Sequence, residues 1–345
     1  MITPPYLKTG DKVAIVAPAK KIPAERIENA VQVLSGWGLE VSTGKHVLGS
    51  HNYFSGTDEQ RTSDMQEALD DESVKAIFCA RGGYGTIRII DRLDFSRFKE
   101  SPKWIIGYSD ITVLHSHINE TLQTETLHAP MPLDYPTEEQ DRNPGLLSLK
   151  KALFGEPLFF EVNQEELNKK GDAQGFLTGG NLSVIMSLLG SPSEPDFQDK
   201  ILFIEDVGES MYQLDRMMTT LKRSGKLARL KGLIAGHLTD FKDNKNTYAF
   251  TKTPEQIISE TVGEYEYPVC FGFPAGHEKN SVSLIMGRQV YLNATADKSF
   301  VEFAEQNTQK MKKGVFKRIL ISAISLTALF LALYFLYSFI INFFS

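Results

Sequence analysis

Three residues far apart in the sequence have side chains that together could carry out nucleophilic catalysis. Ser109 lies in "WIIGYSDIT", where an apolar run ends at a glycine and an amphipathic stretch begins. Glu205 ends the apolar run "ILFIE", a position where a carboxylate without a partner is costly. His277 follows a predicted strand in "FPAGHEKNS". A nucleophilic serine needs a base, and the base needs a third group to orient it. The order Ser, Glu, His along this chain matches one of the orders found in known catalytic triads.

Each of these residues also has a simpler interpretation. A serine on a tight strand-to-helix turn is thrust outward as a nucleophile, but a serine before an amphipathic helix is also the ordinary N-cap. Gly107 stands two residues before Ser109, yet Ile111 replaces the second glycine of G-x-S-x-G, so this stretch alone favours the cap. A lone histidine such as His277 can be a core hydrogen-bonding group or a solvent-exposed residue. For the third group, the alternatives to Glu205 are the two carboxylates that follow it, Asp206 and Glu209.

The elements around Ser109 predict a parallel sheet. Short apolar strands ("DKVAIVAPA", "VKAIFCA", "KWIIGYS") alternate with helical patterns, which is typical of a parallel sheet covered on both faces. Ligands of such sheets bind beyond the carboxyl ends of the strands. The loops "RGGYG" and "GYSD" both fall at such ends, so we expect them to form one site.

Composition changes along the chain predict five segments. We expect an N-terminal α/β nucleophile domain (1–155), a polar connector (156–175), a C-terminal domain with Glu205 and His277 (176–306), a basic juxtamembrane segment (307–318) and a transmembrane helix (319–344).

The last segment has no charged residue from Ile319 to Phe344, and this length suffices to cross a hydrocarbon core of about 30 Å as a helix. A buried core helix is the alternative. Five basic residues precede the segment, and basic flanks tend to stay in the cytoplasm. The N-terminus lacks the features of a signal peptide. We therefore expect a single-pass protein of the cytoplasmic (inner) membrane, anchored by its C-terminal helix, with its catalytic body facing the cytoplasm.

The charge balance excludes a nucleic-acid partner. The chain has 37 Lys and Arg and 43 Asp and Glu, and its net charge is −6. Five of the basic residues and none of the acidic ones lie beyond Glu305, so residues 1–305 carry a net charge of −11. Phosphate contacts need clustered Lys and Arg. The two cysteines, Cys79 and Cys270, lack metal-site spacing, and we expect reduced thiols.

Taken together, the motifs resemble those of the LD-carboxypeptidases, a family of serine peptidases that includes the microcin C self-immunity peptidases. They cover most of residues 10–290 in the family's order: "GDKVAIVAPA", "RGGYGTIRIID", "IIGYSDITVLH", "HAPM", "GGNLSVI", "FIEDVGESMYQLDRMMTTL" and "GFPAGH". The resemblance implies an N-terminal parallel α/β sandwich that supplies the serine and a smaller β-rich C-terminal domain that supplies Glu and His. Ala19 and Ala129 depart from the family's usual serine and glycine, without touching these three residues.

The resemblance also implies a role for each site residue. Ser109 would be the nucleophile, His277 the general base and Glu205 the group that orients it. The backbone N–H groups of Gly83 and Asp110 would form the oxyanion hole, which suits a glycine because its N–H can approach a reacting carbonyl. A phosphate cradle is the rival interpretation of "RGGYG", but the motif lacks the Lys-Ser/Thr of a P-loop and the GxGxxG spacing. No metal or cofactor is implied.

The activity implied is hydrolysis of the bond between an L-centred diamino acid and the terminal D-alanine of peptidoglycan-derived tetrapeptides, as part of cell-wall recycling. Arg81 is a candidate for binding the terminal carboxylate on position alone, and its pairing with an internal acid is the alternative. Two other functions stay open. One is a microcin C immunity-type peptidase acting on peptidyl nucleotides, which the acidic body disfavours. The other is a catalytically silent muropeptide-binding protein, which the intact triad disfavours. A homodimer is also left open.

Overall fold

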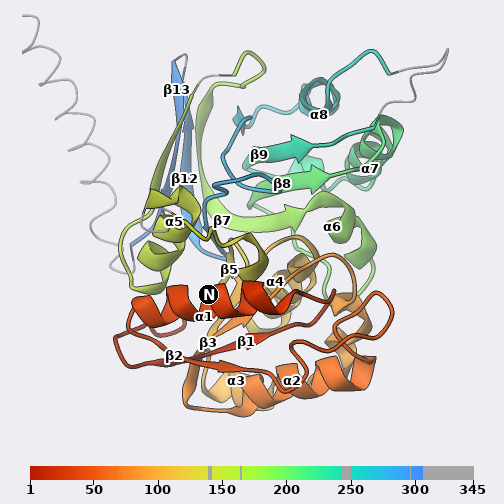
Figure 1. Ribbon diagram of the computed structural model, residues 1–345. Helices are drawn as coiled ribbons and strands as arrows, with labels where there is room; N and C mark the ends of the chain where they lie inside the picture. The colour runs from red at the N-terminus through yellow and green to blue at the C-terminus, as the bar shows by residue number, and fades with distance from the viewer. Residues whose placement is uncertain (139–141, 164, 243–249, 296, 306–345) are drawn as a thin grey trace, which may run out of the picture. The chain divides into compact units, whose positions relative to one another are not determined.

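Two β-sheets organise the fold of residues 1–303 (Figure 1). The computed structural model describes residues 1–138, 142–163, 165–242, 250–295 and 297–305. The first sheet has the strand order β11-β5-β4-β3-β1-β2. Its strands are β1 (Lys12–Val16), β2 (Glu40–Thr43), β3 (Val74–Cys79), β4 (Trp104–Gly107), β5 (Thr126–His128) and β11 (Leu284–Met286).

The first sheet is parallel except at β11, which pairs with β5 in the antiparallel sense. Helices cover both faces of the sheet, as its apolar strands predict (Figure 1). Alternate residues of β1 serve the two faces: Val13 and Ile15 join the core with α1, and Ala14 and Val16 join the core with α2. The helices associated with this part of the chain are α1 (Ala24–Gly36), α2 (Asp58–Asp70), α3 (Ser96–Glu100), α4 (Thr112–Leu122) and α5 (Pro144–Leu153).

The strand order of the first sheet locates a binding site. The chain runs from β1 to β2 on one side and then to β3, β4 and β5 on the other. Loops leaving adjacent strands in opposite directions form a crevice at such a reversal. The loops that follow β1, β3 and β4 meet at the carboxyl edge of this sheet, and they contain "APAK", "RGGYG" and "YSD".

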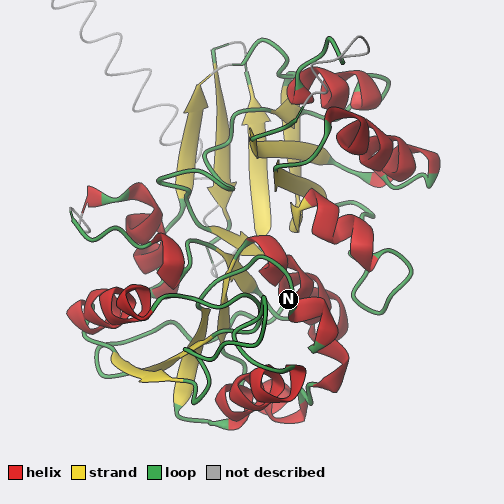
Figure 2. Cartoon of the chain, turned by 45° about the vertical axis from the view of Figure 1, so that its right-hand side comes forward, coloured by secondary structure: helices red, strands yellow, loops and turns green. Residues whose placement is uncertain are grey.

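The second sheet is mixed and has the order β10-β9-β8-β7-β12-β13-β6 (Figure 2). The long strand β7 pairs with β12 in the antiparallel sense through its first half and with β8 in the parallel sense through its second half. Its strands are β6 (Phe159–Asn163), β7 (Gly171–Asn181), β8 (Ile201–Val207), β9 (Gly232–Thr239), β10 (Val269–Cys270), β12 (Gln289–Ala294) and β13 (Lys298–Phe303), with helices α6 (Leu182–Leu188), α7 (Met211–Arg223) and α8 (Pro254–Val262).

The segment expected to be a connector, 156–175, contains β6 and the start of β7, and both strands belong to the second sheet. The strand β11, near the end of the chain, instead completes the first sheet. The chain therefore passes more than once between the two sheets. The domain boundaries expected at 155 and 176 stay a prediction.

The expected transmembrane helix is corrected by the structure. Among the described residues, no helix is long and apolar enough to cross a membrane. The longest described helices, α1, α2 and α7, each have 13 residues, whereas a span needs about 20 apolar residues. The predicted span, 319–344, lies outside the described residues. The α/β fold with a β-rich second part stands, but the fold class with an added membrane helix and the single-pass localisation are contradicted.

Candidate active site

Ser109 occupies a strained turn at the carboxyl end of β4. It opens the short 3-10 helix Ser109–Ile111, which leads into α4. Its φ is +63°, a left-handed conformation that is uncommon for a residue other than glycine and clusters at functional sites. Its side chain caps neither helix, because the N-cap positions fall on Tyr108 and Ile111 and neither helix has a side-chain cap. The N-cap interpretation of Ser109 is therefore excluded by the geometry.

The missing second glycine of the elbow has a structural explanation. A Cβ added to Gly107 would lie 2.8 Å from Cγ1 of Ile111, so the isoleucine fills the space that the glycine leaves. A second glycine lies on the other side of the turn. A Cβ on Gly82 would lie 3.3 Å from Oγ of Ser109 and 3.3 Å from the backbone nitrogen of Asp110. Gly82 thus packs closely on the serine, and a larger side chain there would crowd it; sequence reasoning did not single out this glycine.

The structure brings His277 between the other two predicted residues. Its Nε2 lies 3.0 Å from Oγ of Ser109, and its Nδ1 lies 2.6 Å from Oε2 of Glu205. The side chain of Glu205 is fully buried, and that of His277 is 18% exposed. Burial alone would lower the pKa of His277, but the hydrogen bond and charge of Glu205 outweigh it and raise this pKa above its ordinary value. Ser109, His277 and Glu205 form one hydrogen-bonded chain.

Glycine also allows the approach of His277 to Glu205. Gly276 has φ +131°, and a Cβ there would lie 3.0 Å from Cβ and 3.1 Å from Oε2 of Glu205. The backbone that precedes the histidine can therefore pass directly over the glutamate. His277 itself lies in the loop between β10 and β11, so its position depends on strands of both sheets.

The neighbouring carboxylate, Asp206, has a different task. It accepts hydrogen bonds from Nδ2 of Asn181 and from the backbone N–H of Ser183, each at 2.9 Å. Burial raises its pKa to about 6. Asp206 thus holds the turn from β7 into α6, where Asn181 is the N-cap. Of the three carboxylates considered in the sequence, Glu205 is the one that contacts the histidine.

The glycine-rich loop after β3 is tied to the serine turn through Asp110. The buried carboxylate of Asp110 accepts from both the backbone N–H of Thr86 (2.9 Å) and its hydroxyl (2.6 Å). Burial raises the pKa of Asp110, and the Thr86 contacts oppose this shift. Gly83 has φ +107°, and a Cβ there would meet Tyr53 and Lys20. Gly82 is therefore the glycine packed on Ser109, and the assignment of the Gly83 and Asp110 N–H groups to an oxyanion hole stays a prediction.

Arg81 contacts a backbone carbonyl, and no ion pair joins it to an acid among the described residues. Its Nη1 donates to the carbonyl of Lys21 at 3.1 Å. Burial raises the pKa of Tyr108, the residue before Ser109, and the charge of Arg81 opposes part of this shift. Arg81 therefore lies within electrostatic range of the serine turn.

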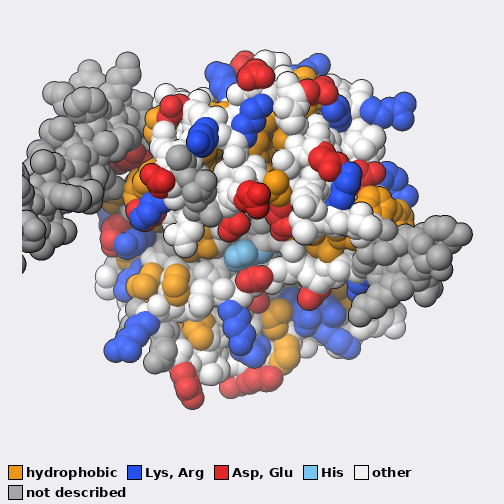
Figure 3. All heavy atoms as spheres, turned by 90° about the horizontal axis from the view of Figure 1, so that it is seen from above, with side chains coloured by type: hydrophobic (Ala, Val, Ile, Leu, Met, Phe, Trp, Pro, Cys, Tyr) orange, Lys and Arg blue, Asp and Glu red, His pale blue; other side chains and the backbone are white. Residues whose placement is uncertain are grey.

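A cavity of about 580 Å³ opens beside His277 and Tyr108. Its lining includes cationic side chains, Arg26 and Lys279, as well as carboxylates such as Asp134. Figure 3 shows acidic, basic and apolar side chains interspersed on one face, with a histidine exposed near the centre. Within the described part of the chain, no group of three or more His, Cys, Asp or Glu side chains could hold a metal ion. The cavity beside His277 thus offers space and polar side chains for a small polar ligand.

Comparison with known proteins shows which family the chain belongs to. Residues 13–129 match the LD-carboxypeptidase N-terminal domain, and residues 174–292 match the LD-carboxypeptidase C-terminal domain. A probable murein peptide carboxypeptidase of Bacillus subtilis is 37% identical over 303 residues, which cover 86% of this chain and 93% of the relative. The chain belongs to the LD-carboxypeptidase family. The family predicted from the motifs is confirmed, and the chain is a serine carboxypeptidase by this membership.

Three further comparisons show what this chain is similar to in sequence or in fold. The murein tetrapeptide carboxypeptidase of Pseudomonas aeruginosa is 32% identical over 278 residues, covering 77% of this LD-carboxypeptidase and 88% of the relative. The crystal structure of muramoyltetrapeptide carboxypeptidase from Oxalobacter formigenes superposes with a TM-score of 0.76 at 30% identity, covering 85% and 98% of the two chains. The microcin C7 self immunity protein MccF gives the same TM-score at 21% identity, with coverage of 87% and 98%, and so shares the fold.

Proposed function

We propose that this chain is a serine-type LD-carboxypeptidase that removes the terminal D-alanine from peptidoglycan-derived tetrapeptides by cleaving its bond to an L-centred diamino acid. The observation that carries the proposal is the hydrogen-bonded chain from Ser109 through His277 to Glu205, with separations of 3.0 and 2.6 Å. The names of the relatives, which are murein peptide and murein tetrapeptide carboxypeptidases, supply the substrate class.

In the proposed reaction, Oγ of Ser109 attacks the carbonyl carbon of the scissile bond while Nε2 of His277 takes the hydroxyl proton. Glu205 accepts the Nδ1–H hydrogen bond, fixes the tautomer of the ring and stabilises the imidazolium. The imidazolium then gives its proton to the leaving amine of D-alanine, and an acyl-enzyme remains. Water, activated by the same histidine, hydrolyses the ester and frees Ser109.

The negative charge of the tetrahedral intermediate needs donors that are already in place. We assign this role to the backbone N–H groups of Gly83 and Asp110. Asp110 N–H lies at the start of the 3-10 helix, where the first backbone donors have no partner within the helix. The close packing of Gly82 on Ser109 and on the Asp110 nitrogen supports the glycine-rich loop as the other wall of this hole.

A carboxypeptidase must also bind the free carboxylate of the residue that it removes. We assign this role to Arg81, whose guanidinium has five N–H donors and uses one of them on the Lys21 carbonyl. The competing cation is Arg26 in the cavity beside His277. A guanidinium suits the task because it binds a carboxylate through two parallel hydrogen bonds.

The second candidate function is a peptidase of the microcin immunity type that acts on peptidyl nucleotides. The fold shared with MccF favours it, since the structures superpose with a TM-score of 0.76. The net charge of −11 on residues 1–305 opposes binding of an anionic nucleotide.

One assay separates these functions. The purified chain is incubated with a murein tetrapeptide or with a peptidyl nucleotide, and the products are identified by mass spectrometry. We expect tripeptide and D-alanine from the tetrapeptide, and none from the Ser109→Ala variant. Cleavage of the peptidyl nucleotide alone supports the second candidate. Binding of the tetrapeptide without turnover supports a silent muropeptide-binding protein instead.

A further inference from the structure

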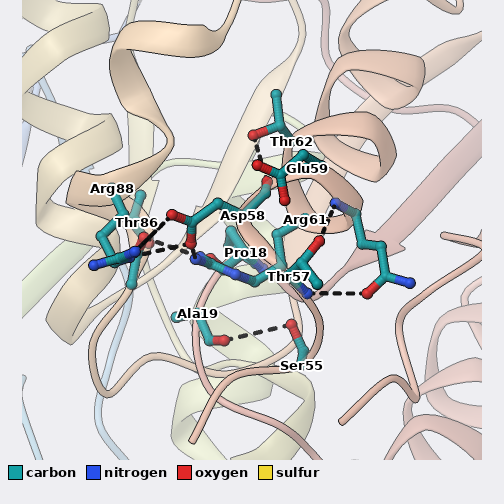
Figure 4. A network of polar contacts seen from close by, with 12 residues as sticks. Pro18, Ala19, Ser55, Thr57, Asp58, Glu59, Arg61, Thr62, Thr86 and Arg88 are labelled. Carbon is teal, nitrogen blue, oxygen red and sulfur yellow. Dashed lines mark hydrogen bonds and ion pairs between the residues drawn. The ribbon is translucent and has the colours of Figure 1, made fainter. Parts of the chain in front are cut away.

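A buried arginine on α2, Arg61, contacts the loops that follow β1 and β3, and Figure 4 shows it beside Pro18 and Asp58. Arg61 is 1% exposed, and its Nη1 donates to the carbonyl of Gly85 at 2.9 Å and to the carbonyl of Pro18. Its Nη2 donates to the carboxylate of Asp58. The guanidinium carbon lies 4.7 Å from the centre of the Phe54 ring. Its N–H groups therefore bind the backbone of two segments that lie far from α2 in the sequence.

Both carbonyls belong to segments that reach Ser109. Pro18 lies in the loop after β1, and Gly85 ends the glycine-rich loop after β3. The two loops are also joined near the serine, where the N–H of Lys20 donates to the carbonyl of Gly82 at 3.4 Å. Gly82 in turn packs on Ser109 and on the Asp110 nitrogen. Arg61 thus contacts two loops that are joined to each other, and one of them, the glycine-rich loop, packs on Ser109.

The peptide group between Gly85 and Thr86 is held from both sides. Its carbonyl accepts from Arg61 at 2.9 Å, and its N–H donates to the buried carboxylate of Asp110 at 2.9 Å. A Cβ on Gly85 would lie 2.9 Å from Nη1 of Arg61 and 3.2 Å from Cα of Ala19, and Gly85 has φ +144°. Glycine at this position allows the guanidinium to approach. This single peptide therefore connects Arg61 to the residue that follows the serine.

Burying a guanidinium requires partners; Nη1 and Nη2 of Arg61 have them, whereas its buried Nε has none among the described residues. Two backbone carbonyls and one carboxylate accept from its planar group, and Asp58 is itself held by Arg88, whose Nη2 lies 2.8 Å from Oδ2. A lysine ammonium is a point charge that cannot reproduce this planar fork. A core that needed only bulk at this position could use an apolar side chain without the cost of desolvating a charge.

We propose that Arg61 is a positioning residue for catalysis, which orients the Gly85–Thr86 peptide and through it the glycine-rich loop and the N–H of Asp110. The proposal rests on the proposed function, because it requires an oxyanion hole made from this loop. Loss of a single oxyanion donor lowers kcat by roughly 10² to 10³ in serine hydrolases. A displaced loop is therefore expected to lower kcat by about tenfold or more, while KM changes by less than about threefold.

The test uses three variants of the full chain. Arg61→Lys removes the planar guanidinium, and Gly85→Ala crowds its contact with the Gly85 carbonyl while the Arg61 side chain itself remains. Arg92→Gln is the matched control, because Arg92 also lies near Asp58 (3.7 Å) but is 46% exposed and bonds Glu59. Each variant is measured for kcat and KM on the tetrapeptide, for thermal midpoint, and for inhibition by phenylboronic acid, whose tetrahedral adduct with serine needs the oxyanion hole. Inhibition by D-alanine reports ground-state binding.

We expect Arg61→Lys and Gly85→Ala to lower kcat and to weaken boronic acid inhibition by similar factors, with D-alanine inhibition and KM nearly unchanged. Arg92→Gln should match the parent. The proposal is overturned if both variants are folded and keep kcat within twofold, or if the loss of activity only follows the loss of folded protein. Should Arg61→Lys fail to fold, Gly85→Ala decides alone by the same criteria. A parent that is itself inactive on tetrapeptide contradicts the proposed function, and not this inference.

Discussion

At the scale of single residues, the three side chains with catalytic potential could be found from their types and from their places at strand ends. Ser109 follows the apolar strand β4, Glu205 lies near the end of the apolar strand β8, and His277 follows a strand, so the sequence could indicate all three. Arg61 could not be found in this way. It lies in the polar stretch "DEQRTSD", where an arginine is ordinarily a solvent-exposed helix residue, and its burial depends on loops that pack onto α2 only in the folded chain.

The pH dependence of the reaction follows from the environment of His277. Glu205 raises the pKa of the histidine above its ordinary value, and the base must be neutral to accept a proton. We therefore expect kcat/KM to rise with pH through this raised pKa, at a higher midpoint than for an ordinary histidine. Glu205→Gln should shift the midpoint to lower pH and lower kcat by roughly 10⁴-fold, as in other triads. A profile of kcat/KM against pH for both proteins checks this, and an unchanged midpoint contradicts the assignment of Glu205.

Replacing each of the two candidate arginines, Arg81 and Arg26, by lysine shows which of them binds the free carboxylate of the substrate. Arg81→Lys should raise KM about tenfold or more and reduce the preference for a free C-terminus over a C-terminal amide, because lysine cannot form the bidentate contact. Arg26→Lys is the matched comparison in the neighbouring cavity. The measurement compares kcat and KM of both variants on a peptide with a free C-terminus and on the same peptide with a C-terminal amide. If Arg81→Lys behaves as the parent and Arg26→Lys loses the preference, the anchor is Arg26.

At the scale of elements, the apolar runs predicted β1, β3 and β4 and the parallel sheet that they form. The same reasoning predicted a polar connector at 156–175, and the structure has β6 and the start of β7 in this segment. β6 (FFEVN) is short and three of its five residues are exposed, so it does not stand out from the polar stretch that follows it. The return of β11 to the first sheet is likewise absent from the local pattern, because the choice of a partner strand is made by tertiary packing.

The turn from β4 into α4 depends on the pair Gly107 and Ile111. Gly107→Ala should lower stability by about 1–3 kcal/mol, since the added Cβ lies 2.8 Å from Cγ1 of Ile111 in a buried site. Combination with Ile111→Ala should cost less than the sum of the two single changes, because the crowding is relieved. Denaturant unfolding of the four proteins measures this coupling. Gly190→Ala is the control for backbone strain, since it also places alanine at a positive φ (+82°) but a Cβ there meets no atom within 4 Å; strictly additive losses contradict the packing explanation.

At the scale of the whole molecule, the site needs both sheets. Ser109 follows a strand of the first sheet, Glu205 belongs to a strand of the second, and the loop with His277 connects β10 of the second to β11 of the first. The resemblance of motifs spread over residues 10–290 predicted this combination, which no single motif could. The membrane helix is the prediction that the described residues contradict. Nothing in the single described chain supports the homodimer that the sequence left open.

The central claim is that Ser109, His277 and Glu205 act as one catalytic unit on murein tetrapeptide. The most direct measurement is the rate of D-alanine release by the parent, Ser109→Ala, His277→Ala and the double variant, with circular dichroism to confirm that each is folded. We expect each single change to abolish all but a small residual rate, and the double variant to be little worse than either, because residues that act together are not additive. A folded Ser109→Ala variant that releases D-alanine at the parent's rate, or losses that multiply in the double variant, would contradict the account.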